Sequence, residues 1–208
     1  MSGVTAELDR LHRKPERGGD RAMLDALLDE VMVGTLSTVV DDLPWSVPML
    51  SARDGDRIVL HGSTGAGALR HVAEGAPVTF TVFALDGIVV ADSLFDHSAN
   101  YRSAVVRGTL EPVRDDAASA LDALSDKLIP GRVAEVRGHT RKEIAATTTL
   151  VLRILDGQWI AKARSGPPGA PEDASAWTGV VPVRTVYDPP ITATGDTPPE
   201  SVRRLVSG

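Results

Sequence analysis

The stretch WSVPMLSARDGDRIVLHGSTGAG, residues 45–67, combines a turn signal with strand-forming runs on both sides. The runs are Trp45–Arg53 and Arg57–His61, and Asp54-Gly55-Asp56 joins them. A tight turn between antiparallel strands needs positive φ angles, which an Asp-Gly step adopts at little cost. The pattern therefore predicts a β-hairpin that runs into a turn of small residues.

Two further Asp-Gly steps lie between β-rich runs and repeat this signal. The expected strand pairs are Val78–Leu85 with Ile88–Ser93 about Asp86-Gly87, and Thr147–Leu155 with Trp159–Ser165 about Asp156-Gly157. A strand over Val33–Val40, ending at Asp41-Asp42, precedes the first hairpin. Six or more antiparallel strands with few helices predict a mainly β fold with peripheral α-helices, as a small closed or partly split barrel.

Helical patterns separate these strands. The expected helices start at Asp20 (with Met23, Leu24, Leu27, Leu28 and Val31 on one face), span Ala66–Ala73, and span Asp116–Leu128. The expected organisation is a flexible basic N-terminal arm over residues 1–19, a barrel domain over 20–183 and a Pro-rich tail over 184–208. We expect the last 20 or so residues to be poorly ordered or wrapped on a partner.

Composition excludes several classes of protein. The chain of 208 residues has no Cys, which rules out disulfides, thiol catalysis and zinc–thiolate sites. Its net charge of −6 argues against nucleic-acid binding. From its polar N-terminus we expect no signal peptide, and no apolar run approaches the ~20 residues of a membrane span. These features predict a cytoplasmic protein.

Two stretches carry candidate binding residues. His61–Gly67 follows a strand and leads into a helix, so it is either a simple turn or a backbone cradle for a phosphate, with Arg70 one turn further on. Phe95–Gly108 (FDHSANYRSAVVRG) is unusually polar for a segment that lies between apolar runs. The guanidinium of its Arg102 can donate two parallel hydrogen bonds to a phosphate. A polar loop that caps the barrel is the alternative interpretation of that second stretch.

Cations and one aromatic residue complete the candidates. Lys162 and Arg164 lie two residues apart on an expected strand and share a face, for solubility or for an anion. Trp177 is either an anchor for the tail or a wall against a planar ring. The five His residues show no paired spacing, which argues against a metal site built by protein ligands alone.

These residues together resemble the pyridoxamine 5′-phosphate oxidase-like, FMN-binding split-barrel family, in its nitroimidazole-resistance-type branch. The similar segments, over residues 13–182, are Val47-Pro48-Met49, Leu60-His61-Gly62-Ser63, Leu85-Asp86-Gly87-Ile88-Val89, His97–Ser103, Lys162–Pro168 and Trp177–Pro182. The resemblance implies a six-stranded antiparallel split β-barrel. It also implies a homodimer with FMN at the subunit interface and a small-molecule substrate.

The resemblance also assigns residues to the cofactor. Those residues are Pro48, Met49, His61, Gly62, Ser63, Thr64, Arg70, Asn100, Tyr101, Arg102, Ser103, Lys162, Arg164 and Trp177. Pro48 and Met49 would line the flavin ring, the His61 turn would face the phosphate, and Lys162, Arg164 and Trp177 would complete the site from either protomer. The candidate catalytic donors are His61 and Tyr101, with His97 as a third.

The chain departs from the family pattern at two points. Many members place Arg or Lys where this chain has Gly65-Ala66-Gly67-Ala68. The phosphate would then be held by Arg102 or Lys162, or held weakly, and Arg102 is the leading candidate for its main partner. We therefore expect Arg102→Ala to weaken FMN binding more than Arg70→Ala. Trp159 stands where a small residue is expected and would narrow the pocket.

Three hypotheses for the function remain. The first is an FMN-dependent oxidoreductase, in which the flavin supplies the redox chemistry and the protein supplies binding and orientation. The second is a non-catalytic carrier or sensor that binds flavin, haem or deazaflavin on the same barrel, because a fold alone does not decide function. The third is a dimeric structural or regulatory protein with an empty pocket.

Overall fold

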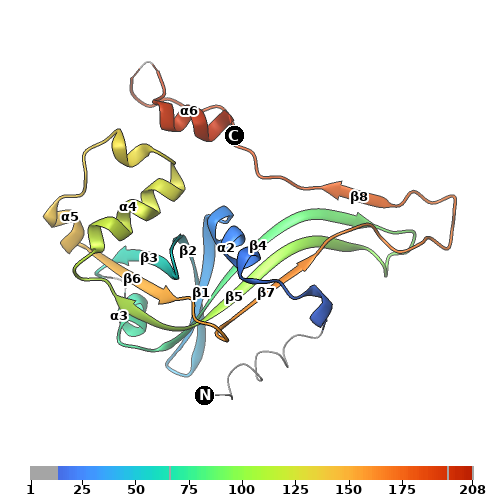
Figure 1. Cartoon of the computed structure of the whole chain (residues 1–208), viewed down its shortest axis with the longest axis horizontal. Coiled ribbons are helices and arrows are strands. Elements are labelled where there is room, and N and C mark those ends of the chain that lie inside the picture. Colours follow the sequence, from blue (N-terminus) through green and yellow to red (C-terminus); the bar gives the residue numbers. More distant parts are fainter. Residues whose placement is uncertain (1–13, 66, 196, 208) are drawn as a thin grey trace.

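The computed structural model describes residues 14–65, 67–195 and 197–207, and within these ranges six antiparallel strands pair in a ring. They are β1 (Val33–Val40), β2 (Leu43–Asp54), β3 (Arg57–Ser63), β4 (Pro77–Val90), β5 (Ser98–Pro112) and β6 (Thr147–Arg153). The order β5–β6–β3–β2–β1–β4 closes when β4 pairs with β5 (Figure 1). The expected mainly β, six-stranded split barrel is confirmed.

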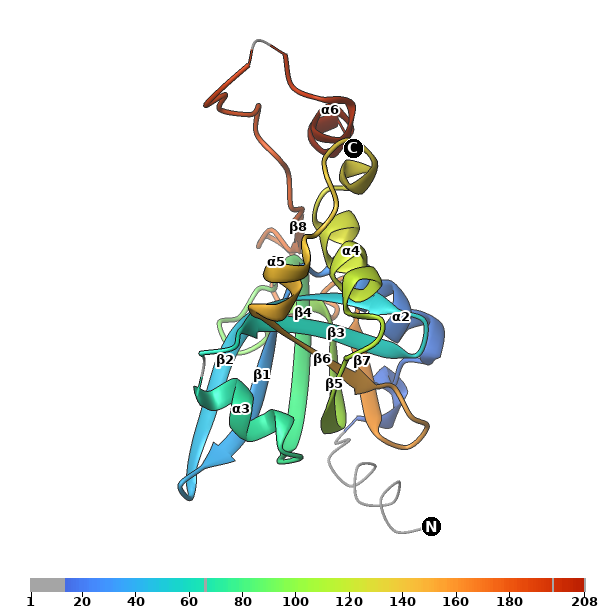
Figure 2. The same ribbon diagram turned by 90° about the vertical axis from the view of Figure 1, so that its left-hand side faces the viewer.

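Two strands of the ring each change partners partway along their length. β2 pairs with β1 over Leu43–Leu50 and with β3 over Ser51–Asp54. β5 pairs with β4 over Ser98–Thr109 and with β6 over Leu110–Pro112. Figure 2 shows β3 and β6 crossing in front of the upright strands β4 and β5. The barrel is therefore split where β2 passes from one sheet to the other.

Two more strands extend one side of the barrel. β7 (Trp159–Arg164) pairs with β5, and β8 (Gly179–Pro182) pairs with β4 beside its outer end. Figure 1 shows β4, β5, β7 and β8 running out together to the right of the barrel. The polar segment from Ser98 lies within this arm as strand, not as a capping loop, because Asn100 to Ser103 pair with β4.

The helices that pack against strands of the barrel are α2 (Arg21–Glu30), α3 (Gly67–Ala73), α4 (Ala117–Leu128) and α5 (Arg141–Ala145). The short η1 (Pro15–Arg17) contacts β7, and η2 (Arg132–Ala134) contacts α4. Helix α6 (Glu200–Ser207) lies off the barrel, beyond α4 (Figure 1). Asp20 caps α2, since its Oδ1 accepts a hydrogen bond of 2.9 Å from the Met23 N–H. None of the helices in the described ranges is long and apolar enough to cross a membrane.

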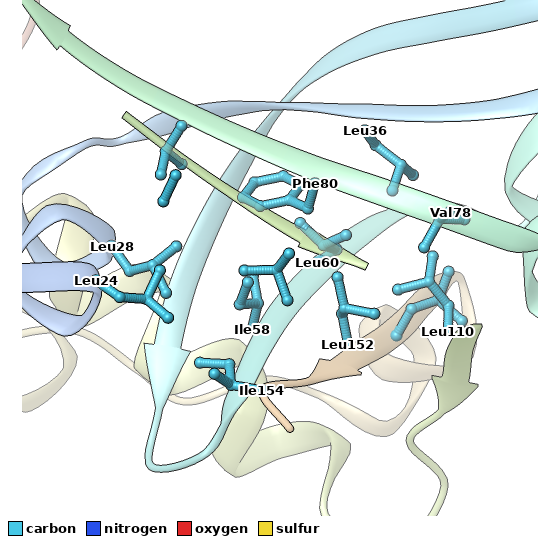
Figure 3. Close-up of a cluster of buried hydrophobic side chains, with 14 of the residues drawn as sticks. Leu24, Leu28, Leu36, Ile58, Leu60, Val78, Phe80, Leu110, Leu152 and Ile154 are labelled. Carbon is cyan, nitrogen blue, oxygen red and sulfur yellow. The ribbon is translucent and has the colours of Figure 1, made fainter. Parts of the chain in front are cut away.

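The barrel encloses the main hydrophobic core. Leu24 and Leu28 of α2 enter it from one opening, and Phe80 of β4 lies among side chains from several strands (Figure 3). Leu69 and Val72 of α3 belong to the same cluster. A second, smaller cluster joins α4 to the outer side of β2, β3 and β6, so α4 is bound to the barrel wall and not to its interior.

Two of the three Asp-Gly hairpin predictions are wrong. Asp54-Gly55 does turn β2 into β3, and Gly55 has a φ of +59°. Gly87, however, lies inside β4, where Asp86 forms an irregularity and a Cβ on Gly87 would lie 2.9 Å from Val180 Cγ1 of β8. This glycine therefore allows β8 to approach β4 closely, and it does not make a turn.

The Asp156-Gly157 step is a turn without a hairpin. Gly157 has a φ of +76°, as a turn requires. The strands on either side, β6 and β7, do not pair with each other; both pair antiparallel with successive parts of β5. The chain therefore continues along β5 after the turn instead of folding back.

Both terminal segments contact the body within the described ranges. Gly18 bridges to Lys162 of β7, and the Gly19 N–H donates to the Ala161 carbonyl at 2.9 Å. At the other end, α6 is held through Ser201, whose hydroxyl and N–H both donate to the Glu135 carboxylate. Of the two alternatives predicted for the last residues, poor order does not hold for Glu200–Ser207, which form α6, and wrapping on a partner stays a prediction. Residues 1–13 of the predicted basic arm lie outside the described residues.

Candidate functional site

The site begins where β2 changes partners. Over residues 43–50, β2 pairs with β1 on one edge, and its other edge has no strand partner among the described residues. β3 continues to Ser63 along β6 and so diverges from β2. Unpaired strand N–H and C=O groups bind any ligand that offers complementary polar atoms. The split thus leaves a row of backbone groups facing open space.

A cleft of about 360 Å³ occupies this opening between β2, β3 and α3. Its lining residues are Trp45, Val47, Pro48, Met49, Leu50, His61, Gly62, Ser63 and Leu69. Five of them, from Pro48 to Ser63, are residues that the sequence assigned to the cofactor. The cleft lies in the size range of small-molecule sites and is mostly apolar with a few polar groups, as such sites are.

Sequence reasoning missed four residues of this cleft: Trp45, Val47, Leu50 and Leu69. Trp45 and Val47 lie two apart on β2, as does Met49, and their partly buried side chains pack against the main core. Alternation along β2 would have placed these three on one face. Leu69 comes from α3, and no local pattern shows that this helix lies over β3.

Gly62 permits this close approach of α3 to β3. A Cβ at Gly62 would lie 2.1 Å from Leu69 Cδ1, so a side chain there would force the Leu69 side chain out of its place over β3. The turn that follows holds itself together, because the Gly65 N–H donates to Ser63 Oγ at 3.2 Å and the Thr64 N–H to the Ala146 carbonyl at 3.3 Å. Arg70, further along α3, is exposed to solvent.

His61 is the titratable side chain of the cleft. It is partly buried, and its Nδ1 is buried with no hydrogen-bond partner among the described residues. Burial lowers the pKa of His61, because the charged imidazolium loses hydration. The ring is therefore neutral near pH 7, and Nδ1 is free to bond to a ligand.

The second predicted cluster lies on the arm, away from this cleft. Tyr101 is paired with Arg164, and Ser103 with Lys162, across β5 and β7. The Arg164 guanidinium donates to Asn100 Oδ1 at 2.6 Å, and Asn100 Nδ2 donates to the Gly166 carbonyl at 3.1 Å. Tyr101, Ser103, Lys162 and Arg164 share one face of the arm, whereas Asn100, next to Tyr101 on β5, starts from the opposite face.

The two clusters are separated within one chain. The strand order β2–β1–β4–β5 puts three inter-strand spacings, or about 14 Å, between the Pro48 strand and the Tyr101 strand. Lys162 and Arg164 on β7 are one strand further. One chain therefore does not bring the arm residues to the cleft that holds Pro48 and His61.

Arg102 is engaged with two carboxylates. Its guanidinium donates to Asp86 at 2.6 Å and to Glu30 at 2.6 Å, so β5 is tied to β4 and to the end of α2. These hydrogen bonds, that to Asp86 foremost, raise the pKa of Arg102. The pairing argues against the expected role of Arg102 as the main partner of a phosphate, because a ligand would have to displace both carboxylates.

Replacing Arg102 tests this assignment. Arg102→Ala leaves Asp86 and Glu30 facing each other without a cation, so we expect the free energy of unfolding to fall by about 1–2 kcal/mol. Flavin affinity of the folded protein should stay within about threefold of wild type. Urea unfolding and flavin titration of the same sample measure both quantities. A large loss of flavin affinity at unchanged stability would restore the phosphate role.

Three other candidates lie outside the cleft. His97 accepts the Ala91 N–H at Nδ1 over 3.1 Å, in the connection between β4 and β5. Trp177 is 66% exposed, and its ring lies over Gly179 at the start of β8. Trp159 packs against the main core from β7 and does not line the cleft, so it does not narrow it.

Comparison with known proteins adds a family and two close structures. Residues 20–157, more than half of the chain, match the family described as pyridoxamine 5′-phosphate oxidase. The FAD and haem binding protein from Mycobacterium smegmatis is 46% identical, with a TM-score of 0.87 over 91% of this chain and 97% of that chain. The flavocytochrome Anf3 from Azotobacter vinelandii is 30% identical, with a TM-score of 0.83 over 95% of this chain and 96% of that chain.

A more distant structure shares the fold. A protein from Bacteroides thetaiotaomicron assigned to 5-nitroimidazole antibiotic resistance is 18% identical, with a TM-score of 0.57 over 69% of this chain and 84% of that chain. A comparison with curated proteins found no match.

Proposed function

The chain belongs to the pyridoxamine 5′-phosphate oxidase family, and we propose that it is a flavin-binding redox protein whose flavin ring lies in the cleft between β2 and β3. The observation that carries this proposal is the unpaired edge of β2 over Leu43–Leu50, which faces an apolar cleft of about 360 Å³. A flavin ring is planar and apolar on its faces, with hydrogen-bonding atoms along one edge. The residues that line the cleft therefore suit a flavin ring.

Each part of the cleft has a role toward such a ring. Backbone groups of Met49 and Leu50 and the carbonyl of Pro48 would bond to its polar edge, and Trp45 and Val47 would exclude water from the ring. The flavin, when bound, supplies hydride or electron transfer with a small-molecule substrate. His61 lines the cleft and is neutral near pH 7, so it would bond to a ring atom or to substrate. The cytoplasmic location expected from the sequence stays a prediction.

We take FAD as the flavin in preference to the FMN expected from the sequence. The relative from Mycobacterium smegmatis at 46% identity is described as FAD and haem binding. Titration of flavin-free protein with FAD and with FMN, followed by calorimetry, tests this choice. We expect FAD to bind at least about tenfold more tightly. Tighter binding of FMN would reverse the choice, and failure of both flavins would overturn the proposed function.

A homodimer is the second part of the proposal. On the outer face of the sheet, Pro48, Thr35, Thr81, Val105 and Ile160 form one uncharged row across five strands. On β1, β2 and β4, Val33, Leu50 and Phe83 are 48%, 39% and 56% exposed. An uncharged row flanked by exposed apolar side chains on the same face favours isologous packing against a second copy.

Such a dimer would join the two clusters that one chain separates. A two-fold axis along the strands, between two of these faces, puts β7 of one copy over β2 of the other. Lys162 and Arg164 of the second copy would then supply cations to the flavin of the first. Mixed dimers test the arrangement: a copy with Ser63→Trp is combined with a copy carrying Lys162→Ala and Arg164→Ala. We expect one restored site per mixed dimer, and no recovery of binding would contradict a shared site.

Haem is a second candidate cofactor, alongside the flavin. The relative from Mycobacterium smegmatis is described as FAD and haem binding, and the relative from Azotobacter vinelandii is described as a flavocytochrome. Within the described ranges, His71 Nε2 bonds to the Val39 carbonyl, His97 Nδ1 to the Ala91 N–H, and His139 lies 3.4 Å from Asp122. His61 differs, because its Nδ1 is buried without a partner and its ring is neutral, as an iron ligand must be.

The His61→Ala variant tests the haem candidate. We expect wild-type protein to bind haemin with a sharp Soret band and the variant to lose that band, while flavin affinity changes by less than about tenfold. His71→Ala, with the ring on α3 bonded to a backbone carbonyl, is the matched control. An unchanged Soret band in His61→Ala would remove His61 as the ligand.

A further inference from the structure

A second cavity, of about 210 Å³, lies under helix α4 against the β2–β3 hairpin. Met32, Leu124 and Leu128 give it apolar walls. It shares Leu50 and His61 with the flavin cleft, so the two spaces meet at these side chains. Anything bound under α4 would therefore lie next to the proposed flavin.

Ser51 points to a missing polar partner in this cavity. Its side chain lines the cavity, the residue is only 3% exposed, and its Oγ has no hydrogen-bond partner among the described residues. His61 lines this cavity as well as the flavin cleft, where its unpaired Nδ1 is already assigned to the cofactor. Buried polar atoms are nearly always hydrogen-bonded in native proteins. The unpaired hydroxyl of Ser51 on the cavity wall therefore indicates a polar group that completes it.

Lys127 adds a positive charge to the same wall. Its Nζ donates to the carbonyls of Leu28 and Val31, each at 2.6 Å, at the end of α2. An ammonium group has three donors, so one N–H remains. Burial lowers the pKa of Lys127 to about 8, and the charge of Asp29 opposes that shift. Near pH 7 the side chain is therefore mostly charged.

We propose that this cavity is a binding site for a small carboxylate with an apolar body, held by Lys127 and Ser51. A cavity of about 150 Å³ holds a benzene molecule, so 210 Å³ accommodates a single ring that bears a carboxylate. The apolar walls receive the ring and Lys127 receives the charge. Its role as the substrate subsite of the flavin rests on the proposed function; the binding itself does not.

Benzoate is the probe, and calorimetry on the full chain is the measurement. We expect benzoate to bind, and Lys127→Met to weaken it by about tenfold or more. Lys142→Met, at an exposed lysine on α5, is the matched control and should bind as wild type does. Toluene and benzylamine, which lack the carboxylate, should bind far more weakly. Equal binding of toluene, or no effect of Lys127→Met, would overturn the proposal.

Two further variants keep the test decisive if Lys127→Met fails to fold. Ser51→Ala removes a hydroxyl that has no partner, so it should fold and weaken benzoate. Leu128→Trp, at a side chain that is 40% exposed, narrows the cavity from its rim. Unchanged benzoate binding in both would overturn the proposal.

The experiment is run with and without flavin. Benzoate binding in both samples supports the cavity, and a change in the flavin spectrum on addition of benzoate supports its place beside the ring. If no flavin binds, the proposed function fails, and benzoate calorimetry on the flavin-free chain still decides the cavity.

Discussion

Ser63→Trp is expected to abolish flavin binding, with a rise in Kd of roughly 100-fold or more, equivalent to about 2.7 kcal/mol. Ser63 is exposed at the end of β3 and lines the cleft beside Gly62. An indole at this position would occupy the space that the ring needs. Because the Ser63 side chain is outside the core, the barrel should fold as before.

Ser119→Trp provides the control for this variant. Ser119 is exposed on α4 and does not line the cleft, so the same change of side chain leaves the site open. Calorimetric titration with FAD compares the two variants, and circular dichroism checks the fold. Wild-type flavin affinity in Ser63→Trp would show that the cleft between β2 and β3 is not the flavin site.

Phe80→Ala is expected to lower the free energy of unfolding by about 3–5 kcal/mol. Phe80 is fully buried at the centre of the barrel core (Figure 3). Its ring fills the space above Gly34, where a Cβ would lie 2.1 Å from Phe80 Cζ. Truncation therefore removes apolar burial and leaves a cavity that the closed ring of strands cannot easily collapse.

Phe83→Ala is the matched control on the same strand. Phe83 lies on the opposite face of β4, is 56% exposed and has its ring 6.4 Å from that of Tyr101. Urea unfolding of the single chain should change by less than about 0.5 kcal/mol, whereas the proposed dimer should weaken. Equal stability losses in the two variants would mean that the faces of β4 are assigned wrongly.

Local signals in the sequence predicted much of the barrel. The spacing of Leu24, Leu27 and Leu28 behind Asp20 predicted α2 and its cap, and both are observed. The run Val33–Val40 was predicted with its observed bounds. These elements depend on neighbours a few residues away: a capping side chain, an apolar period and a turn. Their sequences therefore contain the necessary information.

The local sequence predictions differ from the structure at positions whose conformation or pairing depends on segments far away in the chain. Asp86-Gly87 carries the same turn signal as Asp54-Gly55, yet β4 continues through it because β8, some 90 residues later, packs against Gly87. The local sequence around Arg102 predicts a binding partner for an anionic ligand, whereas in the folded chain its guanidinium pairs with Glu30 of α2. A local pattern contains no trace of either contact.

The same division holds for the site. The sequence by itself determined strand β1, the β2–β3 hairpin, the small-residue turn after His61 and the residue types that the family resemblance assigns to a flavin. Only the tertiary structure separated them into a cleft at β2 and a cluster on the arm, and only it placed Lys127 and Ser51 around one cavity. The physical reason is that turns and helix caps are short-range, whereas burial and charge pairing depend on which strands the closing barrel makes neighbours.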